Sequence, residues 1–333
     1  MKVAIIGCGL IGQKRLRSLR SEDQVIAVAD PVMARAEGLA AQARGAVAYD
    51  DWRRAAEHPD VEAVFVATSN DALAPVTAAA VAAGKHVLVE KPAARHPDEL
   101  VPIISRAEAQ DVRVQVGFNH RYHPALQKAR ELLDSGVLGP MMFIRARYGH
   151  GGRVGYDKEW RARPEISGGG ELLDQGVHLI DLSRWFLGDF PHVQGHVGTF
   201  FWDMPVEDNG FLLLRTAAGQ VAWLHATWTE WKNTFSFELF GRDAKVHIEG
   251  LGGSYGVERL AYYKMKPTMG PPETTIWEYP GEDNSWRVEL AAFADAIAAG
   301  RTPPVTLRDA HAALTIVRKI YDQTPQIARP GGS

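Results

Sequence analysis

The first 120 residues alternate short, almost continuous apolar runs with longer segments in which apolar positions recur at helical spacing. We expect the runs to form strands buried on both faces and the segments between them to form helices. Parallel strands need a crossover connection, so the alternation predicts a doubly wound α/β domain over residues 1–120. The expected strands are 3–6, 25–28, 63–66, 86–89 and 113–116, and the expected helices are 12–20, 32–43, 72–83 and 97–109.

After residue 120 the pattern changes to strand-like runs that follow one another across short turns. Consecutive strands with short connections predict a large, mostly antiparallel sheet, and therefore an α+β domain over residues 121–333. A loop rich in Gly and Arg is expected over 149–170. The expected strands are 141–148, 193–201, 210–216, 220–229, 235–240 and 244–249, and the expected helices are 124–135, 171–187, 286–299 and 306–321, the last two packing back on the body.

Composition narrows the classes of partner. The 37 Lys and Arg residues against 40 Asp and Glu residues give a net charge of −3, which provides no field for nucleic acid or an anionic membrane. The apolar run before Gly7 is too short for a signal peptide or a membrane span. The single cysteine, Cys8, allows no internal disulfide, so we expect a cytoplasmic protein without nucleic-acid or membrane partners.

The string Gly7-Cys8-Gly9-Leu10-Ile11-Gly12 follows the first strand and opens a helix, and Asp30 ends the second strand. This context is typical of a dinucleotide site, in which glycines let the pyrophosphate approach a helix amino end. The Asp30 carboxylate would accept hydrogen bonds from ribose hydroxyls and repel a 2′-phosphate, which favours NAD over NADP. The alternative is a structural glycine turn with a capping aspartate.

Two polar segments, Thr68-Ser69-Asn70 and Glu90-Lys91-Pro92, follow buried strands. The carboxyl ends of parallel strands form the ligand-binding edge of such a sheet. Lys91 is therefore either a solvated surface charge or a group directed at substrate, and the following proline restricts its backbone. The expected cofactor contacts are Gly7, Gly9, Leu10, Ile11, Gly12, Asp30, Thr68, Ser69, Asn70, Glu90, Lys91 and Asn119.

A glycine run at 168–170 leads into a helix that carries Asp174 and His178 one turn apart, with Asp181 next along the same face. Such a polar stripe in an apolar helix suggests the lining of a cavity. An Asp-His pair exposed to water, or a histidine satisfied inside the core, is the alternative. One carboxylate and one imidazole fall short of a usual metal site, so no metal is expected.

Amide, guanidinium and imidazole groups gather at 117–124, where the two predicted domains join, and pockets favour such junctions. We expect a polyhydroxylated ligand there, closed over by part of the loop at 149–170. The Arg and Trp residues of that loop would equally suit a subunit interface. The expected substrate contacts are Arg121, His123, Tyr156, Trp160, Arg161, Asp174 and His178.

These features, in this order, resemble the Gfo/Idh/MocA family of nicotinamide-dependent sugar and polyol oxidoreductases. The most specific segments are GKHVLVEKP at 84–92 and GGGELLDQGVHLID at 168–181. The resemblance implies a Rossmann domain before the antiparallel-sheet domain, a catalytic site containing Lys91, Asp174 and His178, and a cis Lys91-Pro92 bond. The chain departs from the family in having Leu73 where many members carry a histidine.

The hypothesis that follows is hydride transfer from a secondary alcohol of a sugar, polyol or nucleotide sugar to NAD. His178 would act as base because its reference pKa lies near working pH, and Lys91 would stabilise the developing alkoxide. An enzyme that holds NAD tightly and oxidises a sugar transiently, for glycoside cleavage or epimerisation, is an alternative, and a non-catalytic dinucleotide-binding regulator is a remote one.

We expect a homodimer or homotetramer formed through the sheet of the second domain. An antiparallel sheet leaves one face to be covered, and the segment 220–231 offers large apolar side chains for it: Val221, Trp223, Leu224, Trp228 and Trp231.

Overall fold

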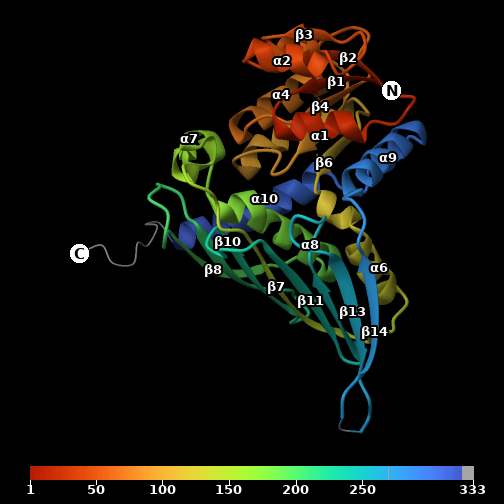
Figure 1. The fold of residues 1–333 in the computed structure, drawn as a ribbon, viewed down its shortest axis with the longest axis vertical. Helices are drawn as coiled ribbons and strands as arrows, with labels where there is room; N and C mark the ends of the chain where they lie inside the picture. The colour runs from red at the N-terminus through yellow and green to blue at the C-terminus, as the bar shows by residue number, and fades with distance from the viewer. Residues whose placement is uncertain (269, 325–333) are drawn as a thin grey trace. The chain divides into compact units, whose positions relative to one another are not determined.

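The computed structural model describes residues 1–268 and 270–324. The chain forms two compact units, each assembled from segments that are separate in sequence (Figure 1). The first contains residues 1–118, 165–168 and 286–315, and the second contains residues 119–164, 169–285 and the described residues from 316 onward. Each unit therefore needs residues from the last part of the chain.

The first unit is built on a six-stranded sheet in the order β3-β2-β1-β4-β5-β6, and all neighbouring strands are parallel. The chain starts at the centre of the sheet and builds outward in both directions, which with right-handed crossovers places helices on both faces. The predicted doubly wound domain is confirmed. Its strands are β1 (Lys2–Ile6), β2 (Gln24–Ala29), β3 (Val47–Tyr49), β4 (Ala63–Val66), β5 (His86–Glu90) and β6 (Val114–Gly117).

Except for the short helix at 164–167, which falls in the predicted loop 149–170, the predicted helices of the first unit begin and end close to the predicted positions. The strand β3 and the helix after it were not predicted, because β3 is a three-residue edge strand without a buried residue. Such a strand has no apolar run from which it could be predicted. The helices are α1 (Leu10–Ser18), α2 (Met33–Ala40), α3 (Trp52–Ala56), α4 (Asn70–Ala82), α5 (Val101–Ala109), α7 (Pro164–Ser167) and α9 (Ser285–Ala298).

Helix α9 belongs to the core of the first unit although it lies far along the sequence. Leu290 and Phe293 are buried in the same apolar cluster as Val3, Ile5 and Phe65 of the parallel sheet. This packing explains why residues 286–315 group with the first unit. Helix α10 (Leu307–Gln323) contributes its residues to 315 to the first unit and its later residues to the second.

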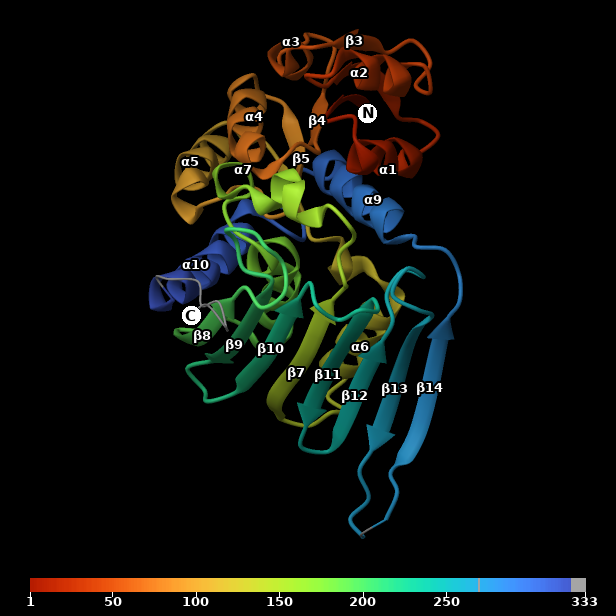
Figure 2. The ribbon, with the colours of Figure 1, turned by 60° about the vertical axis from the view of Figure 1, so that its left-hand side comes forward.

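The second unit contains an eight-stranded sheet in the order β14-β13-β12-β11-β7-β10-β9-β8 (Figure 2). All neighbours are antiparallel except β7 and β10, which are parallel, so the predicted mostly antiparallel sheet is confirmed. The strands are β7 (Met141–Gly149), β8 (His192–Gly198), β9 (Asn209–Arg215), β10 (Val221–Thr227), β11 (Thr234–Gly241), β12 (Ala244–Glu249), β13 (Glu258–Lys264) and β14 (Glu273–Tyr279).

Two of these strands, β13 and β14, were not predicted. The edge strand β14 has no buried residue and therefore lacks the alternation that marks a half-buried strand. Along β10, by contrast, buried and exposed positions alternate. Trp223 is 52% exposed on the open face, whereas Leu224 and Trp228 are fully buried. The expectation that Leu224 and Trp228 would lie on the open face is therefore wrong.

The buried face of this sheet is covered by α6 (Pro124–Asp134) and by α8 (Val177–Leu187), which packs against β7 and β10. The predicted continuous helix 171–187 instead begins with a π-helical turn, Leu172–Gly176. The predicted loop at 149–170 also contains the short 3₁₀ turns Tyr156–Lys158 and Trp160–Ala162. A π-turn inside a helix is frequently found at a functional site.

Candidate active site

The glycine loop between β1 and α1 has the geometry of a phosphate cradle. Gly7 has a φ of +92°, and a Cβ atom there would lie 2.3 Å from the Ala67 carbonyl oxygen. A Cβ atom on Gly12 would lie 2.0 Å from the Gly7 carbonyl oxygen, whereas one on Gly9 would meet nothing within 4 Å. Gly9 therefore faces open space at the start of α1, where unbonded backbone amides favour an anion. These residues fit a dinucleotide.

Asp30 lies at the end of β2 and fixes the same loop. Its Oδ2 accepts a hydrogen bond from the Cys8 amide at 2.9 Å, and its Oδ1 accepts one from the Val32 amide at 2.9 Å. Each carboxylate oxygen can accept more than one hydrogen bond, so both keep capacity for ribose hydroxyls. Burial, and next the Asp30 charge, raises the pKa of Cys8 to about 12, so this thiol stays protonated.

The polar segment after β4 makes local contacts. The Ser69 hydroxyl donates to Asp71 Oδ1 at 2.6 Å, and the buried Asn70 amide donates to the Ser167 carbonyl at 2.8 Å. Thr68 Oγ1 donates to the Ser69 carbonyl at 3.0 Å. Leu73, at the position where the resemblance implies a histidine in many family members, is fully buried in α4. Asn70 thus holds the segment 165–168. Cofactor contacts by Thr68, Ser69 and Asn70 stay predictions.

Lys91 follows β5 and is partly buried, unlike a freely solvated surface lysine. The Lys91-Pro92 peptide bond is cis, as the resemblance implied. The preceding Glu90 accepts a hydrogen bond from Arg15 Nε at 2.7 Å, and Arg15 also donates to Glu289 of α9 at 2.6 Å. All three of these side chains are buried. Glu90 therefore anchors the turn that carries Lys91 to the helix after the glycine loop.

In the second unit, the amino end of the π-turn is held by Glu207. Its carboxylate accepts hydrogen bonds from the Gly170 amide at 3.0 Å, the Leu172 amide at 3.1 Å and the Tyr321 hydroxyl at 2.7 Å. A Cβ atom on Gly170 would lie 1.9 Å from the Glu207 carbonyl oxygen. Glycine is therefore needed at position 170 for close packing. No pattern in the sequence indicated that Glu207 would hold this turn.

His178, on the first turn of α8, is 4% exposed and lies among aromatic rings. Its ring centroid is 3.7 Å from that of His120 and 6.2 Å from that of Tyr148. Tyr148 in turn contacts Tyr255, and burial raises the pKa of Tyr255 to about 12. The tyrosine hydroxyls are therefore neutral near pH 7. Tyr148 and Tyr255 come from distant segments, so sequence reasoning missed them.

Asp174 lies in the π-turn and is partly exposed. Arg161 Nε is 3.2 Å from Asp174 Oδ2, and the Arg161 guanidinium lies 4.6 Å from the centroid of the Trp160 ring. Three of the predicted substrate contacts are thus together. The remaining predicted substrate contact of the loop, Tyr156, is buried in an apolar cluster with Trp228. The structure directs Tyr156 into this cluster and leaves Arg161 and Asp174 partly exposed.

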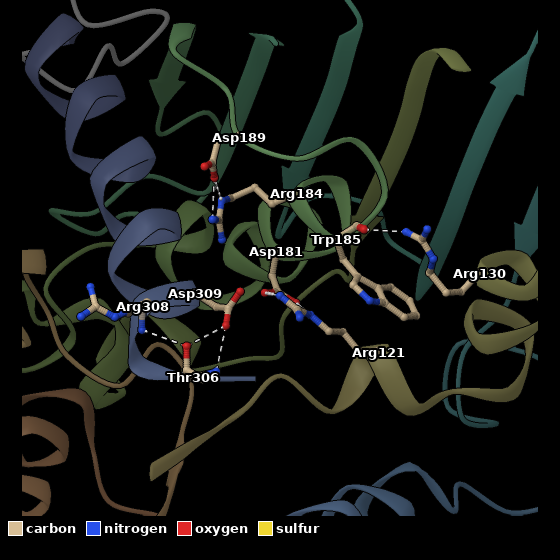
Figure 3. Close-up of polar contacts among 9 residues, drawn as sticks. All are labelled: Arg121, Arg130, Asp181, Arg184, Trp185, Asp189, Thr306, Arg308 and Asp309. Carbon is tan, nitrogen blue, oxygen red and sulfur yellow. Dashed lines mark hydrogen bonds and ion pairs between the residues drawn. The ribbon is translucent and has the colours of Figure 1, made fainter. Parts of the chain in front are cut away.

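Asp181, the last member of the predicted polar stripe, forms a buried ion pair with Arg121 (Figure 3). Arg121 donates from Nε at 2.8 Å and from a terminal nitrogen at 2.6 Å, a bidentate geometry. His178 and Asp181 are both buried, so the alternative of a water-exposed Asp-His helix face does not apply to them.

The rest of the 119–123 segment also uses its polar groups inside the second unit. His123 Nδ1 lies 2.9 Å from Glu258 Oε2, and the Asn119 amide donates to the Ser285 hydroxyl at 2.9 Å. Glu258 additionally accepts from the Ala125 amide at 2.7 Å. These contacts fix the entry into α6. Contacts of Asn119 with cofactor and of His123 with substrate stay predictions.

Within residues 1–268 and 270–324, no group of three or more His, Cys, Asp or Glu side chains is arranged to hold a metal ion. Over the same residues, no helix is both long and apolar enough to cross a bilayer.

The fold and the candidate site point to the class of dinucleotide-dependent oxidoreductases, and known proteins share the fold. Residues 1–118 match the model of the oxidoreductase family with an NAD-binding Rossmann fold, and residues 126–247 match the GFO/IDH/MocA C-terminal domain. The chain belongs to the GFO/IDH/MocA oxidoreductase family.

Individual relatives agree with this assignment. D-glucoside 3-dehydrogenase of Escherichia coli is 31% identical over 335 residues, covering 93% of this chain and 90% of that protein. Levoglucosan dehydrogenase of Pseudarthrobacter phenanthrenivorans is 31% identical over 202 residues, covering 59% of this chain and only 50% of that protein. A solved levoglucosan dehydrogenase in complex with NADH and L-sorbose has the same fold, with a TM-score of 0.86, 22% identity and coverage of 98% of this chain and 97% of that chain.

Proposed function

We propose that this oxidoreductase oxidises a secondary alcohol of a sugar, polyol or sugar derivative with NAD as the hydride acceptor. The observation that carries the proposal is the buried His178 imidazole, which lies on the helix that continues from the Asp174–Arg161 pair. The named relatives that act on a glucoside and on levoglucosan support the substrate class. Bound NAD would supply the hydride acceptor.

His178 acts as the general base, because a histidine with a reference pKa of about 6.5 accepts a proton near neutral pH. The Lys91 ammonium donates a hydrogen bond to the same substrate oxygen and stabilises its developing negative charge. Asp174, oriented by Arg161 at 3.2 Å, accepts a hydrogen bond from a neighbouring hydroxyl. That Lys91 and His178 face one substrate is part of this proposal.

NAD is proposed as the preferred nicotinamide cofactor. Asp30 carries a negative charge next to the glycine loop, and both of its oxygens are held in place by backbone amides. A carboxylate there accepts hydrogen bonds from a ribose and repels a 2′-phosphate.

Two residues that were predicted to contact substrate, Arg121 and His123, have buried carboxylate partners and are assigned a different role. Arg121 and His123 act as positioning residues, because their side chains engage Asp181 and Glu258 inside the second unit. Besides the catalytic Lys91 and His178, we assign substrate contact to Asp174 and to the loop residues Trp160 and Arg161.

The proposal is tested with His178→Ala and Lys91→Met, assayed by NADH formation on a panel of free sugars, glycosides, inositols and nucleotide sugars. A positioned acid or base group contributes about 10²- to 10⁴-fold, so turnover should fall on that scale while NAD binding, measured by calorimetry, is retained. His192→Ala and Lys319→Ala, at exposed positions, are the matched controls. Full activity in both active-site variants would refute the assigned roles.

We further propose a cytoplasmic homodimer or homotetramer that forms through the open face of the eight-stranded sheet. Trp223 and Leu213 lie opposite each other on β10 and β9 and are both exposed, as is Ile276 of β14. Exposed large apolar side chains on this sheet face support the proposed interface.

A further inference from the structure

Three aromatic side chains, Phe201, Trp202 and Trp231, contact one another at the surface of the second unit. The centroids of Phe201 and Trp231 are 4.6 Å apart, and those of Phe201 and Trp202 are 5.2 Å apart, both in edge-to-face geometry. Phe201 is 56% exposed and Trp231 is 66% exposed. We call these three residues the aromatic platform.

The platform is held rigidly by buried polar groups. The fully buried Asp208 carboxylate accepts hydrogen bonds from the Phe201 amide at 2.8 Å and the Trp202 amide at 3.0 Å. The Trp202 indole donates to the Trp228 carbonyl at 3.2 Å. Trp231 has a φ of +57°, a strained conformation for a bulky residue that persists only where the surroundings impose it. Exposed rings fixed in this way are organised before any ligand arrives.

The platform begins one ring away from the proposed substrate site. Trp202 packs on Tyr156, with centroids 5.8 Å apart, and Tyr156 packs on Trp228 at 4.9 Å. The turn Tyr156–Lys158 contacts the turn Trp160–Ala162, whose Arg161 lies 3.2 Å from Asp174. Burial and, next, the Asp174 carboxylate raise the pKa of Tyr156. A continuous row of aromatic side chains thus runs from the neighbourhood of Asp174 to the exposed Trp231.

The exposed area fits a sugar ring better than a protein partner. An aromatic side chain has an area of about 150–250 Å², so the exposed fractions of Phe201 and Trp231 correspond to roughly 200–300 Å². A stable dimer interface needs about 800 Å² from each partner, far more than the platform offers. A pyranose has an apolar C–H face of ring size with hydroxyls at its edge, and the exposed Arg153–Glu159 ion pair lies close to Tyr156.

We propose that the aromatic platform binds the second ring of a glycoside, so that the substrate is a disaccharide or similar glycoside and not a free monosaccharide. The inference rests on the proposed function, because it takes the oxidised ring to lie at Asp174 and His178. The second ring would then lie over Trp202, Phe201 and Trp231.

The experiment compares glucose with maltose, cellobiose and trehalose as substrates for the wild type, Trp231→Ala and Phe201→Ala. We expect at least one disaccharide to have a higher kcat/KM than glucose. Each variant should lower kcat/KM for that disaccharide by about threefold to tenfold, the value of one aromatic contact, and leave kcat/KM for glucose unchanged. Trp52→Ala, a partly exposed tryptophan at the start of α3, is the matched control and should change neither.

A second readout separates this inference from the proposed function. Each disaccharide is titrated against the protein while tryptophan fluorescence is followed, and saturable quenching that is lost in Trp231→Ala supports the platform even where no NADH forms. Equal loss for glucose and for the disaccharide, or no effect of either variant on turnover and quenching, would overturn the inference. A lower molecular mass of the variants by light scattering would assign the platform to a second copy of the chain and overturn it too.

Discussion

Replacing Glu207 by Gln should change how the stability of the protein depends on pH. Burial raises the pKa of this carboxyl from 4.5 to about 7 although three donors hydrogen-bond to it. The folded protein therefore binds the proton more tightly than the unfolded chain. The stabilisation is fully present below about pH 4.5 and is lost as the pH rises through about 7.

The magnitude follows from this difference of about 2.5 pH units. One unit corresponds to about 1.4 kcal/mol, so ionisation of Glu207 removes about 3 kcal/mol over the whole range, of which about 2 to 3 kcal/mol falls between pH 5 and pH 8. The Gln side chain presents an NH₂ group to one backbone amide and costs about 1–3 kcal/mol at every pH. The variant should thus be the less stable protein at pH 5 and should recover relative to the wild type by pH 8.

The assay is urea unfolding of both proteins at pH 5, 6, 7 and 8, followed by tryptophan fluorescence. Carboxyls whose pKa is lowered, such as Glu238 with a pKa of about 2, change the stability mainly below pH 5, and what they contribute is the same in both proteins and cancels in the difference. Glu249→Gln, at an exposed position of β12, is the control and should show no such trend. A difference between Glu207→Gln and wild type that stays constant or widens with rising pH would refute the reasoning.

Three further predictions address the cofactor, the core and the assembly. Asp30→Ser removes the charge that repels a 2′-phosphate, so the ratio of kcat/KM for NADP to that for NAD should rise at least about tenfold in steady-state assays. Arg121→Met removes the bidentate partner of the buried Asp181 carboxylate and should lower the free energy of unfolding by about 3–5 kcal/mol; Arg121→Met combined with Asp181→Leu should restore much of that loss, and an additive loss would contradict the pairing. Trp223→Glu puts a charge on the open sheet face and should give a smaller species by light scattering, whereas an unchanged mass would exclude this face as the interface.

Sequence reasoning succeeded where a residue's role depends on its own segment. The apolar run at 63–66 predicted a buried strand because every side chain of β4 is buried. The glycine string and Asp30 were recognisable because strand, turn and helix follow one another locally. The helix that carries Asp174 and His178 was also predicted, although its first turn is π-helical.

Sequence reasoning failed where the role of a residue depends on partners from distant segments of the chain. The glycine run at 168–170 was recognised as leading into the helix, but its packing role was not: a Cβ atom on Gly169 would lie 2.1 Å from the Tyr321 hydroxyl, so close packing explains that glycine. Arg121 was predicted to contact substrate, which stays a prediction, but its buried ion pair with Asp181, 60 residues away, was not foreseen. Neither the aromatic surroundings of His178 nor the anchor Glu207 could be found without the fold.

The Arg15–Glu90–Glu289 link has a consequence for biosynthesis. Arg15 and Glu289 are 274 residues apart, and α9 also supplies Leu290 and Phe293 to the first core. When residues 1–118 leave the ribosome, they therefore emerge with one carboxylate partner missing and an apolar surface open. The packing of the nucleotide-binding unit therefore stays incomplete during translation of the eight-stranded sheet, because α9 is synthesised after it. The first unit can complete its core only after α9 has been translated.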